Sequence, residues 1–326
     1  MTATWKDWMY SVIVPTYNRA QNLGPTLESL LAQVTDLPYE IIVVDNNSSD
    51  ETGAVARVHE ARAHGKLHYI FQREQGLSLA RNAGIAAAKG DVIAFVDDDA
   101  IASPNWLENV AATYRTHPDA WCVGGKIVLG PQIVLPSWFD PTSKSLLAHL
   151  SCLDLGDDIV KLEYPRGVFG ANFSVRRDAL SRVGLFNPNL GWNGKDHHLA
   201  GEESDLCRRI YRAGGSIYYC GQAMVTHVVA SRLTKRYFRQ HAYSEGRTFV
   251  TLFPERLPRG NWRTAARLGF GALKMCAGAL YRYSLGDVRG ALERELGLWS
   301  RLGGLQETLG PRRVTGNRVN HFDRGG

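Results

Sequence analysis

The sequence has few cysteines, and they follow neither a disulfide framework nor a zinc site. Their number is odd, they are widely spaced, and no two form a C-x-x-C pair. We therefore expect a reducing compartment. The five are Cys122, Cys152, Cys207, Cys220 and Cys276.

Long hydrophobic runs are also missing. The first ten residues, MTATWKDWMY, contain Lys6 and Asp7 and lack the apolar stretch of a secretory signal. The most apolar later stretch, residues 265–280, is interrupted by Arg267 and Lys274, and a spanning helix needs ~20 apolar residues. We expect a cytoplasmic protein that is at most peripheral at the inner face of a membrane.

Two glycine-rich loops are missing as well. No G-x-G-x-x-G follows a predicted strand, which argues against a dinucleotide-dependent oxidoreductase. The first predicted strand continues as VPTYNR, whereas nucleotidylyltransferases have a G-x-G-x-R loop there. The net charge of +6 is accompanied by no nucleic-acid reading motif, so we expect no nucleic-acid partner.

What the N-terminal half does contain is apolar runs of strand length that alternate with helical patterns. Strands are predicted over residues 11–15, 40–45, 67–71 and 91–99. Between them, Ser48 and Glu51 have the spacing of a capping box, and an alanine-rich helix is predicted over residues 77–88. Ser103 with Pro104 predicts the start of another helix. This alternation favours an α/β fold with a mainly parallel sheet flanked by helices.

The C-terminal third changes character. Further strands are predicted in WCVGGKIVL, GANFSV and SIYYC, residues 131–167 show no clear period, and the pattern from residue 233 is helical and basic. We expect an α/β domain over residues 1–230, a helical basic extension over 231–310 and a disordered tail over 311–326. The extension suits an anionic membrane surface or a phosphorylated ligand, or it is a solvated face over a helical core or homodimer contact. Its basic residues are Arg232, Lys235, Arg236, Arg239, Arg247, Arg256, Arg259, Arg263, Arg267 and Lys274.

Polar side chains follow three of the predicted strands. In a parallel sheet, the carboxyl ends of the strands meet at one edge, where ligands bind. Residues 15–19, 45–48 and 97–99 should therefore converge on one crevice.

The third of these clusters consists of three consecutive aspartates, which repel one another unless a cation is near. Along an extended chain, Asp97 and Asp99 face one side while Asp98 points elsewhere. Carboxylate oxygens suit Mg²⁺ or Mn²⁺. The alternative is a solvated acidic turn that precedes the helix at Pro104.

Four segments, VIVPTYNRAQNL, EIIVVDNNSSDET, QGLSLARNAGIAAAKGDVIAFVDDDA and GEESDLCRRIYRAGG, occur in this order. Together they closely resemble the inverting glycosyltransferase family 2 with its GT-A fold, over roughly residues 11–229. The resemblance implies a metal-dependent transfer of a sugar from a nucleotide-diphosphate donor, which we expect to be a UDP-sugar, to a hydroxyl of a glycan or glycolipid. A non-enzymatic alternative is a sugar-nucleotide or glycan-binding protein with a degenerate site.

The resemblance also implies a donor site. Asp97 would contact the ribose, Asp99 would hold Mn²⁺ or Mg²⁺, and His227 would complete the metal site, although a histidine near a strand end is more often a core or surface residue. Pro15 and Tyr17 are also expected to bind the donor, and the alternative is that they form a turn with a packed aromatic ring. The other residues expected to bind the donor are Thr16, Arg19, Asp45, Asn47, Arg81 and Asp98.

For catalysis, the family's E-D pair supplies the general base, and this chain has Glu202 and Glu203 there. We expect Glu203 to be the base, with the choice between the two left open by its longer side chain. Without the resemblance, the acidic first turn of a helix would suffice to explain both residues. Gly170, Asn172 and Trp192 are expected at the acceptor, and Trp192 reads equally well as a core aromatic.

Overall fold

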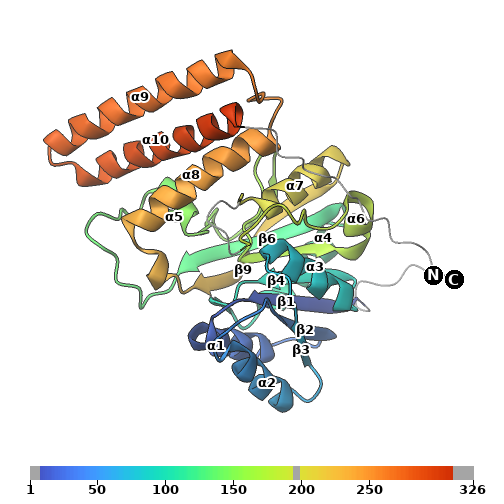
Figure 1. The fold of residues 1–326 in the computed structure, drawn as a ribbon. Coiled ribbons are helices and arrows are strands. Elements are labelled where there is room, and N and C mark those ends of the chain that lie inside the picture. Colours follow the sequence, from blue (N-terminus) through green and yellow to red (C-terminus); the bar gives the residue numbers. More distant parts are fainter. Residues whose placement is uncertain (1–7, 194–198, 311–326) are drawn as a thin grey trace.

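The computed structural model describes residues 8–193 and 199–310 of the chain. Its centre is a nine-stranded sheet in the order β3-β2-β1-β4-β8-β6-β9-β5, with β7 paired to β9 (Figure 1). Helices cover both faces of this sheet. The α/β fold class predicted from the sequence is confirmed.

The first four strands form a parallel half-sheet. They are β1 (Tyr10–Thr16), β2 (Tyr39–Asp45), β3 (Leu67–Phe71) and β4 (Val92–Val96). All pairs among them are parallel. The connecting helices are α1 (Ala20–Leu31), α2 (Thr52–Arg62) and α3 (Leu77–Ala87). Every residue of β1, β2 and β4 is buried, as expected of strands covered on both faces.

The second half of the sheet is mixed. It contains β5 (Ala100–Ala102), β6 (Ala120–Leu129), β7 (Ile159–Leu162), β8 (Asn172–Arg176) and β9 (Ser216–His227). Strand β8 runs antiparallel to both β4 and β6, whereas β6 and β9 are parallel. The parallel arrangement expected from the sequence therefore holds for the N-terminal half. The helices of the second half are α4 (Trp106–Thr116), α5 (Lys144–His149), α6 (Arg177–Val183) and α7 (Glu202–Arg212).

Each face of the sheet has its own core. On one face, Leu23 and Leu27 of α1 and Trp106 of α4 pack with alternate strand residues. On the other, Ile85 of α3 and Leu206 of α7 pack with the opposite set. This division follows from the alternation of side chains along each strand.

Three helices follow the sheet, after a 3₁₀ turn (Ala230–Arg232). They are α8 (Lys235–Leu252), α9 (Trp262–Ser284) and α10 (Val288–Leu309), and α10 lies between α8 and α9 (Figure 1). Glycines allow α8 and α10 to approach closely, because a Cβ on Gly246 would lie 1.8 Å from the Ser300 carbonyl oxygen. A third core joins α5, α8 and α10. None of the described helices is both long and apolar enough to cross a membrane.

Two helix starts differ from the prediction. Helix α2 begins at Thr52, and the Ser48 hydroxyl accepts from the Asn18 amide instead of capping it, so the predicted capping box is wrong. Helix α4 begins at Trp106 behind Asn105, slightly later than Ser103 and Pro104 suggested. The domain boundary at residue 230 stays a prediction, and the predicted tail, 311–326, lies outside the described residues.

Candidate functional site

The loops after β1, β2 and β4 meet at one edge of the sheet. Thr16 and Asp45 are paired at the ends of β1 and β2. Hydrogen bonds join the two following loops, because the Asn18 amide donates to the Ser48 hydroxyl at 2.9 Å and the Arg19 amide to the Thr52 hydroxyl at 2.8 Å. The side chains of Arg19 and Asp98 approach to 3.8 Å, which brings in the third loop.

The β1 and β2 side of this edge offers several of the expected donor contacts. Pro15 and Thr16 are buried in β1. Asp45 is also buried, with one carboxylate oxygen accepting from the Ser48 amide and the other from the Tyr69 hydroxyl, each at 2.9 Å. Asn47 is exposed and adopts a left-handed backbone with φ of 66°. Asp45 is thus held rigidly, while Asn47 presents its amide to solvent.

Tyr17 and Trp192 come together from segments far apart in the chain. Their ring centroids lie 5.0 Å apart with the planes tilted by 38°. The Trp192 carbonyl accepts from the Leu77 amide at the start of α3, which fixes this loop against the sheet edge. Trp192 remains 38% exposed, so part of its ring faces solvent beside the expected donor site.

Asp97, Asp99 and His227 form a group whose ligand atoms all lie within 4.8 Å of one another. The pairing of Ala100 in β5 with His227 in β9 brings the aspartates and the histidine together. The alternation predicted from the sequence is observed, since Asp98 points to Arg19 and stands outside this group.

The hydrogen bonds of His227 fit a metal ligand. Its Nδ1 lies 3.0 Å from the Leu150 carbonyl oxygen, and because a carbonyl can only accept, Nδ1 must carry a proton. In the neutral ring, the Nε2 lone pair then points at Asp99 Oδ1, 2.8 Å away. Two acceptors at this distance require a proton or a cation between them. A backbone carbonyl behind a ligating histidine is a common second contact in metal sites.

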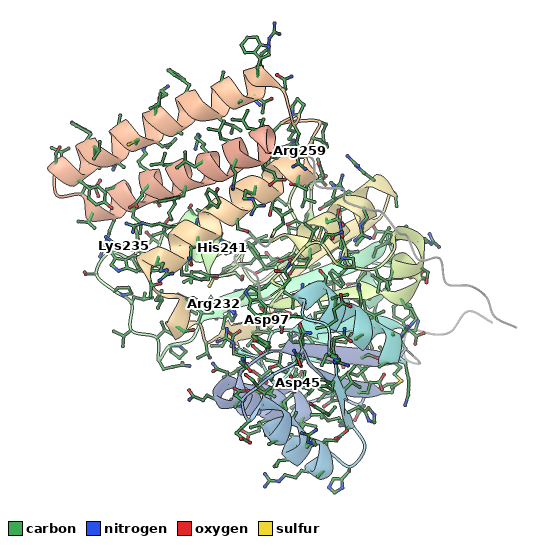
Figure 2. The ribbon with its side chains drawn as sticks, in the orientation of Figure 1. Asp45, Asp97, Arg232, Lys235, His241 and Arg259 are labelled. Carbon is green, nitrogen blue, oxygen red and sulfur yellow. The ribbon has the colours of Figure 1, made fainter. Side chains whose placement is uncertain are left out.

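Arg232 is a site residue that the sequence reasoning did not place. Its Nη2 donates to Asp99 Oδ2 at 3.0 Å. Figure 2 shows Arg232 close to Asp97, the first of the three aspartates. Burial opposes the charged carboxylate, but the Arg232 guanidinium holds the pKa of Asp99 well below its usual range. From the sequence, Arg232 was only one of the basic residues of the C-terminal third. Its position five residues after His227 was the one available sign that it lies near the expected metal site.

Asp98 has a different environment from its neighbours. Burial, with the adjacent Asp99 carboxylate, raises the pKa of Asp98 to about 7. Its backbone carbonyl accepts from the Thr26 hydroxyl in α1. This aspartate therefore anchors the loop to α1 and to Arg19, and it has no part in the group that includes His227.

Arg81 is a buried connector. Its side chain is 1% exposed, donates to Glu202 Oε1 at 2.7 Å and lies 3.7 Å from Asp97 Oδ1. The rings of Phe95, Phe173 and Phe186 surround the guanidinium at 5.4 to 5.9 Å. The donor contact expected for Arg81 stays a prediction; in the structure its guanidinium lies between Glu202 of α7 and Asp97, which follows β4.

Glu202 and Glu203 begin α7 and differ in their contacts. Glu202 is buried and bound to Arg81. Glu203 is half-buried, and its Oε1 accepts from the Gly170 amide at 3.2 Å, whereas its Oε2 has no hydrogen-bond partner among the described residues. Burial and the neighbouring Glu202 carboxylate raise the pKa of Glu203 well above its usual range.

The residues expected at the acceptor are placed unequally. A Cβ on Gly170 would lie 2.5 Å from Arg81 Nη2, so this glycine makes room for the arginine. Asn172 is buried in β8, where Oδ1 accepts from the Trp106 indole and Nδ2 donates to two backbone carbonyls, of Lys126 and Ala223. Its amide is therefore used within the fold, and the acceptor role expected for Asn172 does not fit. Trp192 has an exposed ring, as described above.

Comparison with known proteins identifies the family of the chain. The family described as "Glycosyl transferase family 2" matches residues 11–183. A glucosyl-dolichyl phosphate glucuronosyltransferase of Haloferax volcanii is 34% identical over 67% of this chain and 68% of its own length. The succinoglycan biosynthesis protein ExoM of Rhizobium meliloti is 29% identical over 93% of this chain and 96% of its own length.

Among solved structures, the mannosyltransferase PcManGT from Pyrobaculum calidifontis, in complex with GDP-Man and Mn²⁺, is 18% identical. It aligns with a TM-score of 0.59 over 91% of this chain and 86% of its own. This likeness supports the GT-A fold. With the family match covering more than half of the sequence, the conclusion is that the chain belongs to glycosyl transferase family 2 and is an enzyme that transfers a sugar from a nucleotide-sugar donor.

Proposed function

We propose that the enzyme is a metal-dependent, inverting transferase that moves a sugar from a nucleotide-diphosphate donor to an acceptor hydroxyl. The observation that carries the metal dependence is the group of Asp97, Asp99 and His227, whose ligand atoms all lie within 4.8 Å of one another. Asp97, Asp99 and His227 would hold Mn²⁺ or Mg²⁺. The ion would neutralise charge on the leaving diphosphate.

Glu203 is the residue that accepts the proton of the acceptor hydroxyl in this proposal. Its Oε2 has no hydrogen-bond partner among the described residues, whereas Glu202 Oε1 accepts from Arg81. As the acceptor oxygen forms its bond to the anomeric carbon, the bond from that carbon to the diphosphate oxygen breaks on the opposite face. The hydroxyl proton moves to Glu203, and the configuration at the anomeric carbon is inverted.

Arg232 supplies a fixed positive charge beside the same aspartates. Its guanidinium contacts Asp99 and remains partly exposed, so it can also attract the diphosphate. Asp45, Asn47, Tyr17 and Arg19 would hold the nucleoside at the neighbouring loops.

The donor and the metal are tested together by measuring nucleoside diphosphate release from UDP-, GDP- and dTDP-sugars with Mn²⁺, with Mg²⁺ and with EDTA. We expect release from a UDP-sugar that requires a divalent ion and is lost in Asp99→Ala. Turnover that persists in EDTA would refute the metal dependence. Preference for another nucleotide would refute the UDP assignment alone. Calorimetric binding of UDP without any turnover would favour a binding protein.

The base is tested by Glu203→Gln and Glu202→Gln. Loss of one general base typically costs ~10²- to 10⁴-fold in rate. We expect a loss of this size in kcat for Glu203→Gln. For Glu202→Gln we expect lower thermal stability together with the loss of activity, because Arg81 loses its charged partner. Full activity in Glu203→Gln would refute the assignment.

For the acceptor, we propose a glycan carried by a lipid phosphate at an anionic membrane surface. One relative is named for a dolichyl phosphate acceptor. On α9, Leu273 is 70% and Leu280 65% exposed, and Trp262 and Phe270 are also exposed. At about 100° per residue, these four lie on one arc of the helix, with Arg263 and Lys274 at its flank. An apolar stripe flanked by basic residues is typical of helices that lie on anionic membranes.

The other basic residues of the extension are largely used within the protein. Arg239 pairs with Glu295, and both Arg247 and Arg259 pair with Glu307. The membrane proposal therefore rests on α9 alone, and we no longer propose that the basic residues of the whole extension contact the membrane.

Sedimentation with phosphatidylglycerol vesicles tests the α9 face. We expect the wild-type chain to sediment and Leu273→Ser/Leu280→Ser to stay in the supernatant. Val34→Ser, which changes an exposed apolar residue remote from α9, is the matched control and should sediment. Equal sedimentation of the double variant and the wild type would refute the proposal. A change from dimer to monomer in the double variant without vesicle binding would instead identify α9 as a homodimer contact.

A further inference from the structure

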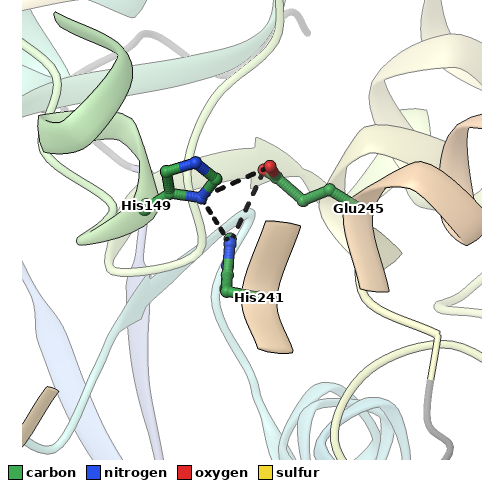
Figure 3. A group of neighbouring side chains, drawn as sticks. All are labelled: His149, His241 and Glu245. Carbon is green, nitrogen blue, oxygen red and sulfur yellow. Dashed lines mark hydrogen bonds and ion pairs between the residues drawn. The ribbon is translucent and has the colours of Figure 1, made fainter. Parts of the chain in front are cut away.

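A second group of metal-binding side chains lies outside the glycosyl transfer site. His149 ends α5, and His241 and Glu245 are one turn apart on α8 (Figure 3). All three residues offer ligand atoms that lie within 4.8 Å of one another. None of them was identified from the sequence, because His149 is distant in the chain from the other two.

The distances within this group suit a small ion. His149 Nδ1 lies 2.9 Å from His241 Nδ1 and 3.4 Å from a carboxylate oxygen of Glu245. His241 Nδ1 lies 3.8 Å from the other oxygen of that carboxylate. In a tetrahedral zinc site with bonds of about 2.0 to 2.2 Å, ligand atoms are about 3.4 Å apart. The two separations measured from His149 Nδ1, 2.9 and 3.4 Å, lie near this value, and one ligand atom from each of the three residues can be chosen with all separations within 4.8 Å.

The chemistry of the group also favours a cation. Two imidazole nitrogens face each other and a carboxylate, so all three atoms carry lone pairs unless a proton is placed among them. Two histidines and one carboxylate form a ligand set typical of zinc and related divalent transition metals. His149 is 7% exposed, and Glu245 is more accessible, which leaves solvent a route to the remaining coordination positions.

The surroundings hold the ligands in place. The His149 ring meets the edge of the buried Phe238, and its backbone carbonyl accepts from the Tyr237 hydroxyl. The next carbonyl along the chain, that of Leu150, is the one that faces His227 Nδ1. An ion here would tie α5 to α8 and hold that carbonyl against the catalytic metal ligand.

We propose that His149, His241 and Glu245 form a second metal site, which binds a divalent transition metal of the zinc type and clamps α5 to α8. The site is separate from the aspartates that would hold the catalytic ion. Its ligands belong to α5 and α8, and its role is to position the Leu150 carbonyl behind His227.

The test measures metal content in a full-length Asp99→Ala background, which removes the main ligand of the first site. After incubation with Zn²⁺ and dialysis, we expect one zinc per chain in Asp99→Ala and in Asp99→Ala/Gln240→Ala. Gln240 is an exposed neighbour on α8 and serves as the control. In Asp99→Ala/His241→Ala we expect an affinity for zinc weaker by at least ~10-fold, because even the loss of a residue behind a metal ligand typically costs ~10- to 100-fold. Equal zinc content in the control and the His241 variant, or no zinc in either, would overturn the proposal.

A spectroscopic measurement covers the case in which His241→Ala does not fold. Co²⁺ in the same Asp99→Ala background should give the intense visible absorption of a tetrahedral site, and the conservative Glu245→Gln should change or abolish it. Saturating Zn²⁺ should also raise the melting temperature of Asp99→Ala by ~5 °C but leave that of Asp99→Ala/Glu245→Gln unchanged. An identical Co²⁺ spectrum and an identical shift in both chains would refute the site.

Discussion

Replacement of Arg81 by methionine tests the buried connection between α7 and the aspartates. The Arg81 side chain is 1% exposed and that of Glu202 7%, and the two are in contact at 2.7 Å. Removing one partner of a buried ion pair costs about 3 to 5 kcal/mol, because the other charge stays buried without compensation. For a chain of this size, 1 kcal/mol corresponds to about 2 °C in melting temperature. Arg81→Met should therefore melt roughly 6 to 10 °C below the wild type.

A double-mutant cycle identifies the cause. If the cost comes from the stranded carboxylate, Arg81→Met/Glu202→Met should be more stable than the sum of the single losses predicts, by about 2 to 3 kcal/mol. Activity should not return with stability, because Arg81 also lies beside Asp97 and Glu202 precedes the proposed base. Urea unfolding followed by tryptophan fluorescence measures the stability, and nucleoside diphosphate release measures the activity.

A surface ion pair provides the control. Arg115 and Glu108 are paired on α4 with both side chains about one third exposed. Arg115→Met should cost only about 0 to 1 kcal/mol. If the Arg81 and Glu202 losses simply add, or if Arg115→Met is as costly as Arg81→Met, the buried ion pair does not have the role assigned to it.

Three further predictions concern neighbouring residues. The raised pKa of Glu203 places the acid limb of the kcat/KM profile above the usual glutamate range, since a base must be deprotonated to act; a limb at the ordinary glutamate pKa would contradict this. Gly170→Ala should lower stability by about 1 to 3 kcal/mol, because its Cβ would meet the Arg81 guanidinium, and a thermal melt equal to the wild type would count against the close contact. Asn172→Ala should lower the melting temperature while leaving the acceptor KM of the folded fraction unchanged, because the amide holds the Trp106 indole; a raised acceptor KM at unchanged stability would restore the acceptor role.

The sequence by itself predicted most of the helices and strands of the N-terminal half and the edge of the sheet at which the candidate site lies. The apolar run at residues 40–45 falls within β2, which is buried on both faces, and the alanine-rich pattern from Leu77 coincides with α3, because strand burial and helix periodicity are encoded in consecutive residues. The alternation of side chains along an extended chain separated Asp97 and Asp99 from Asp98. The four motifs, read together as a resemblance, identified the family that the comparisons confirm.

The direction of the strands in the second half of the sheet could not be predicted from the sequence. Side chains alternate in the same way in parallel and antiparallel strands, so nothing in GANFSV reveals that β8 runs against both of its neighbours. The hydrogen-bond partners of Asn172 could not be predicted from the sequence either. A polar residue in a strand can face a ligand or fill its hydrogen bonds within the core, and only the positions of Trp106, Lys126 and Ala223 decide between the two.

Contacts between distant segments were decided by the tertiary structure alone. Arg81 and Glu202 are 121 residues apart in the chain, and Asp99 and Arg232 are 133 apart. His149 meets His241 across a similar distance in sequence, 92 residues. Periodicity and capping report on neighbours within a few residues, whereas these charges are brought together by the packing of whole helices on the sheet. The sequence therefore identified the chemical groups that are present, and the tertiary structure determined which of them are in contact.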